Sequence, residues 1–127
     1  MAVRTSASFA EADAQIRAAL KAQGFGVLTE IDVRSVLREK LGEQMEQYVI
    51  LGACNPPLAH RALSADRSVG LLLPCNVVVR ADGDGTVVEA LDPRMIAEVT
   101  GQPLLKDIAD EAAARLRAAL GTLPPPR

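Results

Sequence analysis

The sequence is nearly without aromatic residues: it has no tryptophan, one tyrosine and two phenylalanines among 127 residues. It also has a single histidine, two cysteines and no basic excess, since its net charge is −2. Nucleic-acid binders need a basic face, and single-strand binders add aromatic platforms for the bases. We therefore expect no nucleic-acid partner and a core built from aliphatic side chains.

The chain has no apolar run near the roughly 20 residues that a membrane helix requires, and 1–8 lack the apolar segment of a signal peptide. We therefore expect a cytoplasmic protein with no membrane partner, in which both cysteines are reduced thiols. The two cysteines and the single histidine, His60, do not form a recognised zinc spacing. The sequence identifies neither a metal nor a cofactor.

Length and composition favour one domain. The chain is 49% hydrophobic and 24% charged, which is ordinary for a globular protein of this size. We expect a single domain over 1–127, in which 119–127 form a loose C-terminal tail that contains three consecutive prolines.

In the first half of the chain, helical and extended patterns alternate. N-cap residues, including a capping box at 8–11, precede apolar residues at helical spacing. Strands are expected between these helices, and the segment 47–53 is apolar at successive positions, which predicts an interior strand covered on both faces. The expected helices are 9–23, 32–42 and 55–65, and the expected strands are 2–5, 25–31 and 47–53.

In the second half, 69–81 is a long extended run that Pro74 interrupts. The turn sequence Asp-Gly-Asp-Gly at 82–85 predicts a hairpin with 86–91, and two helices follow, opened by Pro93 and Pro103. This order indicates the α+β class: a single two-layer domain with a mixed or antiparallel sheet of four to five strands and helices packed on it.

Two aliphatic runs, 48–53 and 69–73, each lead into a cysteine beside an asparagine and a proline. Cys54 is expected at a strand end just before a helix N-terminus, where the backbone amides favour a thiolate. If the strand of Cys75 lies beside the strand that ends at Cys54, the thiols could form a redox pair, hold a soft metal or line a pocket. The alternative is that both are small buried hydrophobes.

The neighbouring amides of Asn55 and Asn76 could bind a polar ligand where strands end. The alternative for Asn55 is a helix cap, and for Asn76 a backbone partner beside Pro74. Cys54, Asn55, Cys75 and Asn76 are thus the candidate ligand-binding residues. No acid–base or nucleophile–base pair can be placed, so no catalytic residue is assigned and an enzyme is the less favoured interpretation.

Three segments resemble signature motifs of the family called domain of unknown function 302. They are 23–32 (QGFGVLTEID), 50–56 (ILGACNP) and 70–79 (GLLLPCNVVV), and the resemblance extends from about residue 9 to residue 116. It implies a small bacterial or archaeal α+β domain that forms homodimers, and it brings no assigned activity and no catalytic residues.

Three hypotheses about function follow from the residues and the resemblance. The first is a small domain that binds a small ligand or a soft metal near Cys54 and Cys75. The second is a structural or interaction module that acts through a homodimer surface, which the aliphatic richness motivates. The third is a thiol-dependent redox protein with Cys54 as its reactive group.

Overall fold

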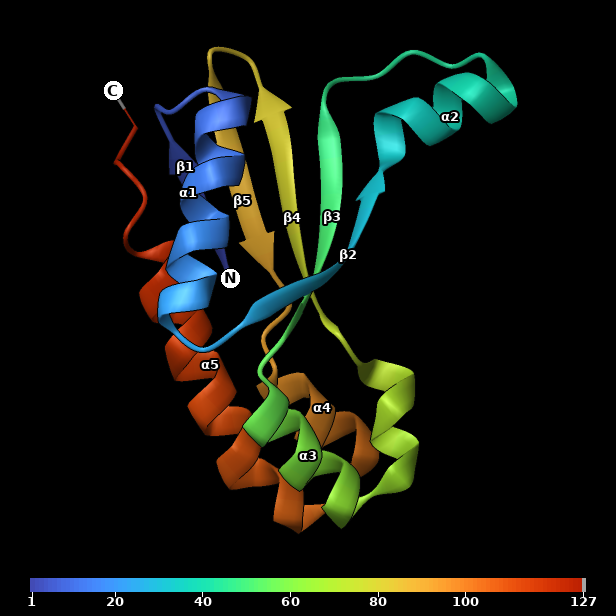
Figure 1. Cartoon of the computed structure of the whole chain (residues 1–127), viewed down its shortest axis with the longest axis vertical. Helices are drawn as coiled ribbons and strands as arrows, with labels where there is room; N and C mark the ends of the chain where they lie inside the picture. The colour runs from blue at the N-terminus through green and yellow to red at the C-terminus, as the bar shows by residue number, and fades with distance from the viewer. Residues whose placement is uncertain (127) are drawn as a thin grey trace.

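The computed structural model describes residues 1–126 as one antiparallel sheet with two helices on one side, helices at one end, and a further helix beside the edge strand β2 (Figure 1). The five strands lie in the order β1-β5-β4-β3-β2, so β1 and β2 are the edges. The predicted α+β class with packed helices is confirmed, and the sheet is wholly antiparallel. The strands are β1 Ala2–Thr5, β2 Gly26–Asp32, β3 Tyr48–Cys54, β4 Cys75–Asp82 and β5 Gly85–Ala90. The helices are α1 Phe9–Ala22, α2 Val33–Leu41, α3 Pro56–Ala65, α4 Arg94–Thr100 and α5 Lys106–Leu120, with short 3₁₀ turns η1 Arg67–Leu72 and η2 Pro103–Leu105.

The local signals in the sequence act as expected at most helix ends. Ser8 accepts a hydrogen bond from the Glu11 amide, and the Glu11 carboxylate accepts one from the Ser8 amide, which completes the capping box of α1. Asp32 caps α2 through the Ser35 amide. Gly42 ends that helix at φ 67°, a backbone conformation that favours glycine.

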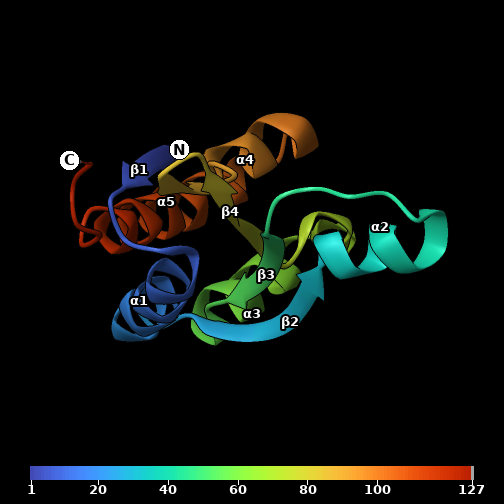
Figure 2. The same ribbon diagram turned by 90° about the horizontal axis from the view of Figure 1, so that it is seen from above.

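One face of the sheet is covered by α1 and α5, which lie on the same side of it (Figure 2). The side chains that alternate toward this face form the main core. Its fully buried members include Ile16, Leu20, Leu51, Val79, Val88 and Leu116. A second, smaller cluster around Val69 and Leu105 joins α3, η1, α4 and α5 beyond the end of the strands.

The opposite face of the sheet has less cover than the sequence predicts. The segment predicted as an interior strand is β3, and it does lie between β2 and β4. Its prediction as covered on both faces is wrong, because Ile50 stays partly exposed while Val49 and Leu51 are buried. The apolar residues at successive positions of β3 therefore have two roles. Val49 and Leu51 belong to the core on one face, and Ile50 belongs to an apolar row on the other face.

Two further boundaries differ from prediction. The run expected to be extended from residue 69 begins as the 3₁₀ turn η1, in which Asp66 accepts from the Ser68 amide and Val69 turns into the second cluster. The strand β4 begins only at Cys75. The tail expected to be loose from residue 119 is packed as far as Leu123, since its aliphatic side chains belong to the core. The remaining tail is described to residue 126, and residue 127 lies outside the described residues.

Candidate functional site

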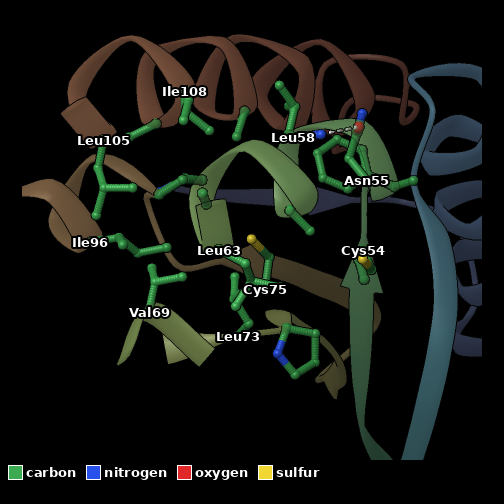
Figure 3. Close-up of a pocket in the computed structure, with 18 of the residues that line it drawn as sticks. Cys54, Asn55, Leu58, Leu63, Val69, Leu73, Cys75, Ile96, Leu105 and Ile108 are labelled. Atoms are coloured by element: carbon green, nitrogen blue, oxygen red, sulfur yellow. Dashed lines mark hydrogen bonds between the residues drawn. The ribbon is translucent and has the colours of Figure 1, made fainter. Parts of the chain in front are cut away.

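The antiparallel pairing of β3 and β4 brings both cysteines to the same end of the sheet. Ala53 pairs with Cys75, so the last residues of β3 meet the first residues of β4. Cys54 and Cys75 both line one cavity at this end, as Figure 3 shows. The structure thus places the two thiols around a shared space, although 20 residues, which include α3 and η1, separate them along the chain.

The cavity has a volume of about 300 Å³ and is almost entirely aliphatic. Its wall comes from the strand ends, from one side of α3, and from α4, η2 and α5 (Figure 3). No charged side chain lines it among the residues that the structure describes. The labelled wall residues include Leu58, Leu63, Val69, Ile96, Leu105 and Ile108. Such a space suits a ligand or ligand part that carries no charge.

Both thiols are free and partly exposed. Burial raises the pKa of the Cys75 thiol above its ordinary value, and the nearby Cys54 raises that pKa further because two thiolates would repel each other. Cys75 therefore stays protonated at neutral pH and presents an S–H group to the cavity. This thiol is a soft, weakly polar wall element and a poor nucleophile.

Asn55 lies in the cavity wall, but its amide has structural partners. The side chain is buried, with 7% of its surface exposed. Its oxygen accepts from the Leu58 amide at 3.3 Å and so caps α3, while Nδ2 donates to the Gln23 carbonyl at 3.4 Å. Because both ends of the amide are engaged, the helix-cap interpretation describes Asn55 better than a free ligand-binding group does.

Asn76, the fourth predicted site residue, is not brought to the cavity. It is exposed on the opposite face of the sheet, where it lines a shallow hollow with Tyr48 and Val78. The physical reason is strand alternation: Asn76 follows Cys75 directly, so the two side chains point to opposite faces. His60 is also exposed and does not line the cavity.

The sequence prediction missed the far wall of the cavity. Ile96, Leu105 and Ile108 lie some 40 residues or more from Cys54 in the chain, yet they close the space opposite the thiols. The only sequence signal for them was the apolar stripe of the last two helices. That stripe predicts burial, but it does not say against which element.

Gly52 allows a close approach next to the cavity wall. A Cβ atom at this position would lie 2.1 Å from Thr29 Oγ1 and 2.8 Å from Pro74 Cγ. Thr29 and Pro74 thus sit directly over the Gly52 backbone, and Pro74 immediately precedes Cys75. The absence of a side chain at Gly52 lets β4 begin close against β3.

Two searches of the described residues bear on the class of site. Residues 1–126 hold no group of three or more histidine, cysteine or acidic side chains arranged to bind a metal ion. Within the same residues, no helix is long and apolar enough to span a bilayer. The two thiols are the soft metal-binding groups that line the cavity.

Comparisons with known proteins agree with the motifs. A search of curated proteins finds no significant match. Among solved structures, the chain is similar to the crystal structure of an uncharacterized conserved protein DUF302 from Bacillus stearothermophilus, with 35% sequence identity and a TM-score of 0.89. The match covers 95% of this chain and 94% of that one. The sequence profile described as "Domain of unknown function DUF302" matches residues 1–123. The chain therefore belongs to the DUF302 family.

Proposed function

We propose that this protein binds a small, uncharged and largely apolar ligand in the cavity that Cys54 and Cys75 line. The observation that carries the proposal is the shared cavity itself: two thiols and an aliphatic wall surround about 300 Å³ of space. Ligand pockets are concave and mostly apolar, and they begin at about this volume. At roughly 30 Å³ for each water-sized group, the cavity holds a ligand part of about ten non-hydrogen atoms.

The wall chemistry restricts the ligand class. A buried carboxylate or ammonium would need a partner charge or several hydrogen bonds, and the cavity wall offers neither. The thiols supply the polarisable contacts, and the protonated Cys75 adds one weak donor. We therefore favour a medium-length alkyl group or a compact ring compound over a charged metabolite.

A test compares neutral and charged probes of equal length. Octanol and octanoate differ mainly in charge, so octanol should raise the melting temperature of the protein and octanoate should not at neutral pH. The variant Ala59→Leu adds bulk to a wall residue of α3 and should weaken octanol binding about tenfold or more. The matched variant His60→Leu adds a leucine at the adjacent exposed position and should leave binding unchanged. Equal binding by both variants would refute the cavity as the site.

A soft monovalent metal is the alternative ligand at the same thiols. Thiolates select ions such as Cu(I), which is stable with few ligands. Titration with Cu(I) under reducing conditions should give one bound ion per chain, and either Cys54→Ser or Cys75→Ser should abolish it. Retention of the ion by both serine variants would exclude this alternative. Two free thiols around one cavity are also compatible with the reducing conditions of the cytoplasm.

We further propose that the chain acts as a homodimer. The outer face of the sheet carries Ile31, Ile50 and Val78 in cross-strand register, and Ile31 is 48% exposed. Antiparallel sheets with one solvated face normally place polar residues on it. Sedimentation at micromolar protein concentration tests this proposal, and a monomer at every concentration would overturn it.

A further inference from the structure

The helix α2 has an apolar side that the described chain covers only in part: Val33 and Leu37 are half-buried, whereas Val36 and Leu41 are exposed. Val33, Val36, Leu37 and Leu41 recur at helical spacing, yet no residue of α2 is buried. Leu41 is 68% exposed and Val36 is 38% exposed. Figure 1 shows α2 reaching away from the body of the molecule beside β2. A helix of nine residues is too short to be stable by its own hydrogen bonds, so packing has to support it.

The sheet face beside α2 is also apolar and only partly covered: Ile31 is exposed, and Ile50 and Val78 are half-buried. Ile31 on β2 pairs with Ile50 on β3, and Ile50 pairs with Val78 on β4, which gives a continuous row across three strands. Six of the seven residues of β2 are exposed. The α1 and α5 helices lie on the other side of the sheet, whereas α2 lies on the side of this row (Figure 2). Helix and row together form one broad apolar surface, which we call the open face.

The charges of α2 and of the remaining chain are opposite. The helix carries Arg34, Arg38 and Lys40 against one acid, Glu39, while the whole chain has a net charge of −2. Among the described residues, none of the three basic side chains forms an ion pair within 4 Å. The positively charged helix is thus complementary in charge to a second copy of this chain, whose net charge is negative.

We propose that the open face is the interface with a second copy of this chain, in which α2 of each copy packs across the Ile31–Ile50–Val78 row of the other. This inference rests on the proposed homodimer and names its contact surface. A two-fold axis would complete the cover of both surfaces at once, because each copy supplies one helix and one row. The basic helix then faces an acidic partner, which favours a second copy over a basic or neutral protein.

Matched variants test the interface. Leu41→Glu places a charge on α2, and Ile31→Glu places one on the row. Leu104→Glu is the control, since Leu104 on η2 is 67% exposed and Leu41 is 68% exposed. Mass measurement by light scattering across protein concentrations should show that both interface variants raise the dimer dissociation constant at least about tenfold. The control should match the original chain. Far-UV circular dichroism should show the same helix and strand content in all four proteins.

The outcomes separate this inference from the homodimer proposal. A dimer that dissociates in Leu41→Glu and Ile31→Glu but not in Leu104→Glu supports the open face as the interface. A dimer that survives both interface variants overturns the interface and leaves the homodimer standing. A chain that stays monomeric overturns both. If only one of Leu41→Glu and Ile31→Glu dissociates the dimer, the reciprocal helix-on-row arrangement is refuted, because in that arrangement both surfaces lie in the interface.

Discussion

Gly52 offers the sharpest test of how the cavity is built. We predict that Gly52→Ala destabilises the fold and weakens ligand binding, because the new methyl group would lie 2.1 Å from Thr29 Oγ1 and 2.8 Å from Pro74 Cγ. Thr29 is exposed and can rotate its hydroxyl away. The Pro74 ring is held by its own backbone, so either the ring or β3 has to shift.

The magnitude follows from two opposing effects. Extra atoms in a packed site cost about 1–3 kcal/mol, whereas replacing glycine restricts the unfolded chain and returns about 0.4–1 kcal/mol. The net destabilisation should be about 1–2 kcal/mol. For a domain of this size, that lowers the melting temperature by roughly 4–10 °C. Pro74 precedes Cys75, so a displaced ring also shifts one thiol and should weaken octanol binding.

Urea unfolding and calorimetry measure this effect, and the chain offers a matched control. A Cβ at Gly26, also in a strand, would meet nothing within 4 Å. Gly26→Ala should therefore leave stability unchanged or raise it slightly. Adding Thr29→Ala to Gly52→Ala should recover part of the loss, with a coupling of about 0.5 kcal/mol or more. If Gly52→Ala is as stable as Gly26→Ala, the reasoning about the close approach is refuted.

Three other predictions concern single polar groups. Asn55→Ala should lose about 1–2 kcal/mol of stability, and Asn55→Ser should recover most of it because serine also caps helices; equal stability of both would contradict the cap. The hydrogen bond from Arg94 lowers the pKa of Asp92 to about 2, so its stabilising effect is present above about pH 4 and is lost as pH falls toward 2. Asp92→Asn should thus cost about 1–2 kcal/mol at pH 7 and little at pH 2, as acid unfolding curves would show; a constant difference would contradict this. In a Cys54→Ser background, Cys75 should be alkylated more slowly than a model thiol at pH 8, since its pKa is raised. A reaction as fast as that of the model thiol would contradict the raised pKa of Cys75.

Much of the secondary structure could be predicted because its causes are local. The capping box at Ser8, the cap at Asp32 and the glycine at Gly42 each act within one turn of the chain. The hairpin between β4 and β5 likewise depends on the adjacent turn residues. The failures occurred where a distant contact decides the outcome. Val69 turns into a cluster with Leu105, so a segment that reads as extended becomes a 3₁₀ turn.

For the candidate site, the sequence by itself determined that two cysteines end or begin strands, since that follows from the aliphatic runs beside them. Only the tertiary structure decided that Cys54 and Cys75 share a cavity, that Asn76 faces away from it, and that Ile96 and Ile108 close it. The physical reason is that strand pairing and helix packing join residues far apart in the chain. Hydrophobic pattern fixes which side chains seek burial, whereas the sheet register and the helices packed against the strand ends fix which of them meet.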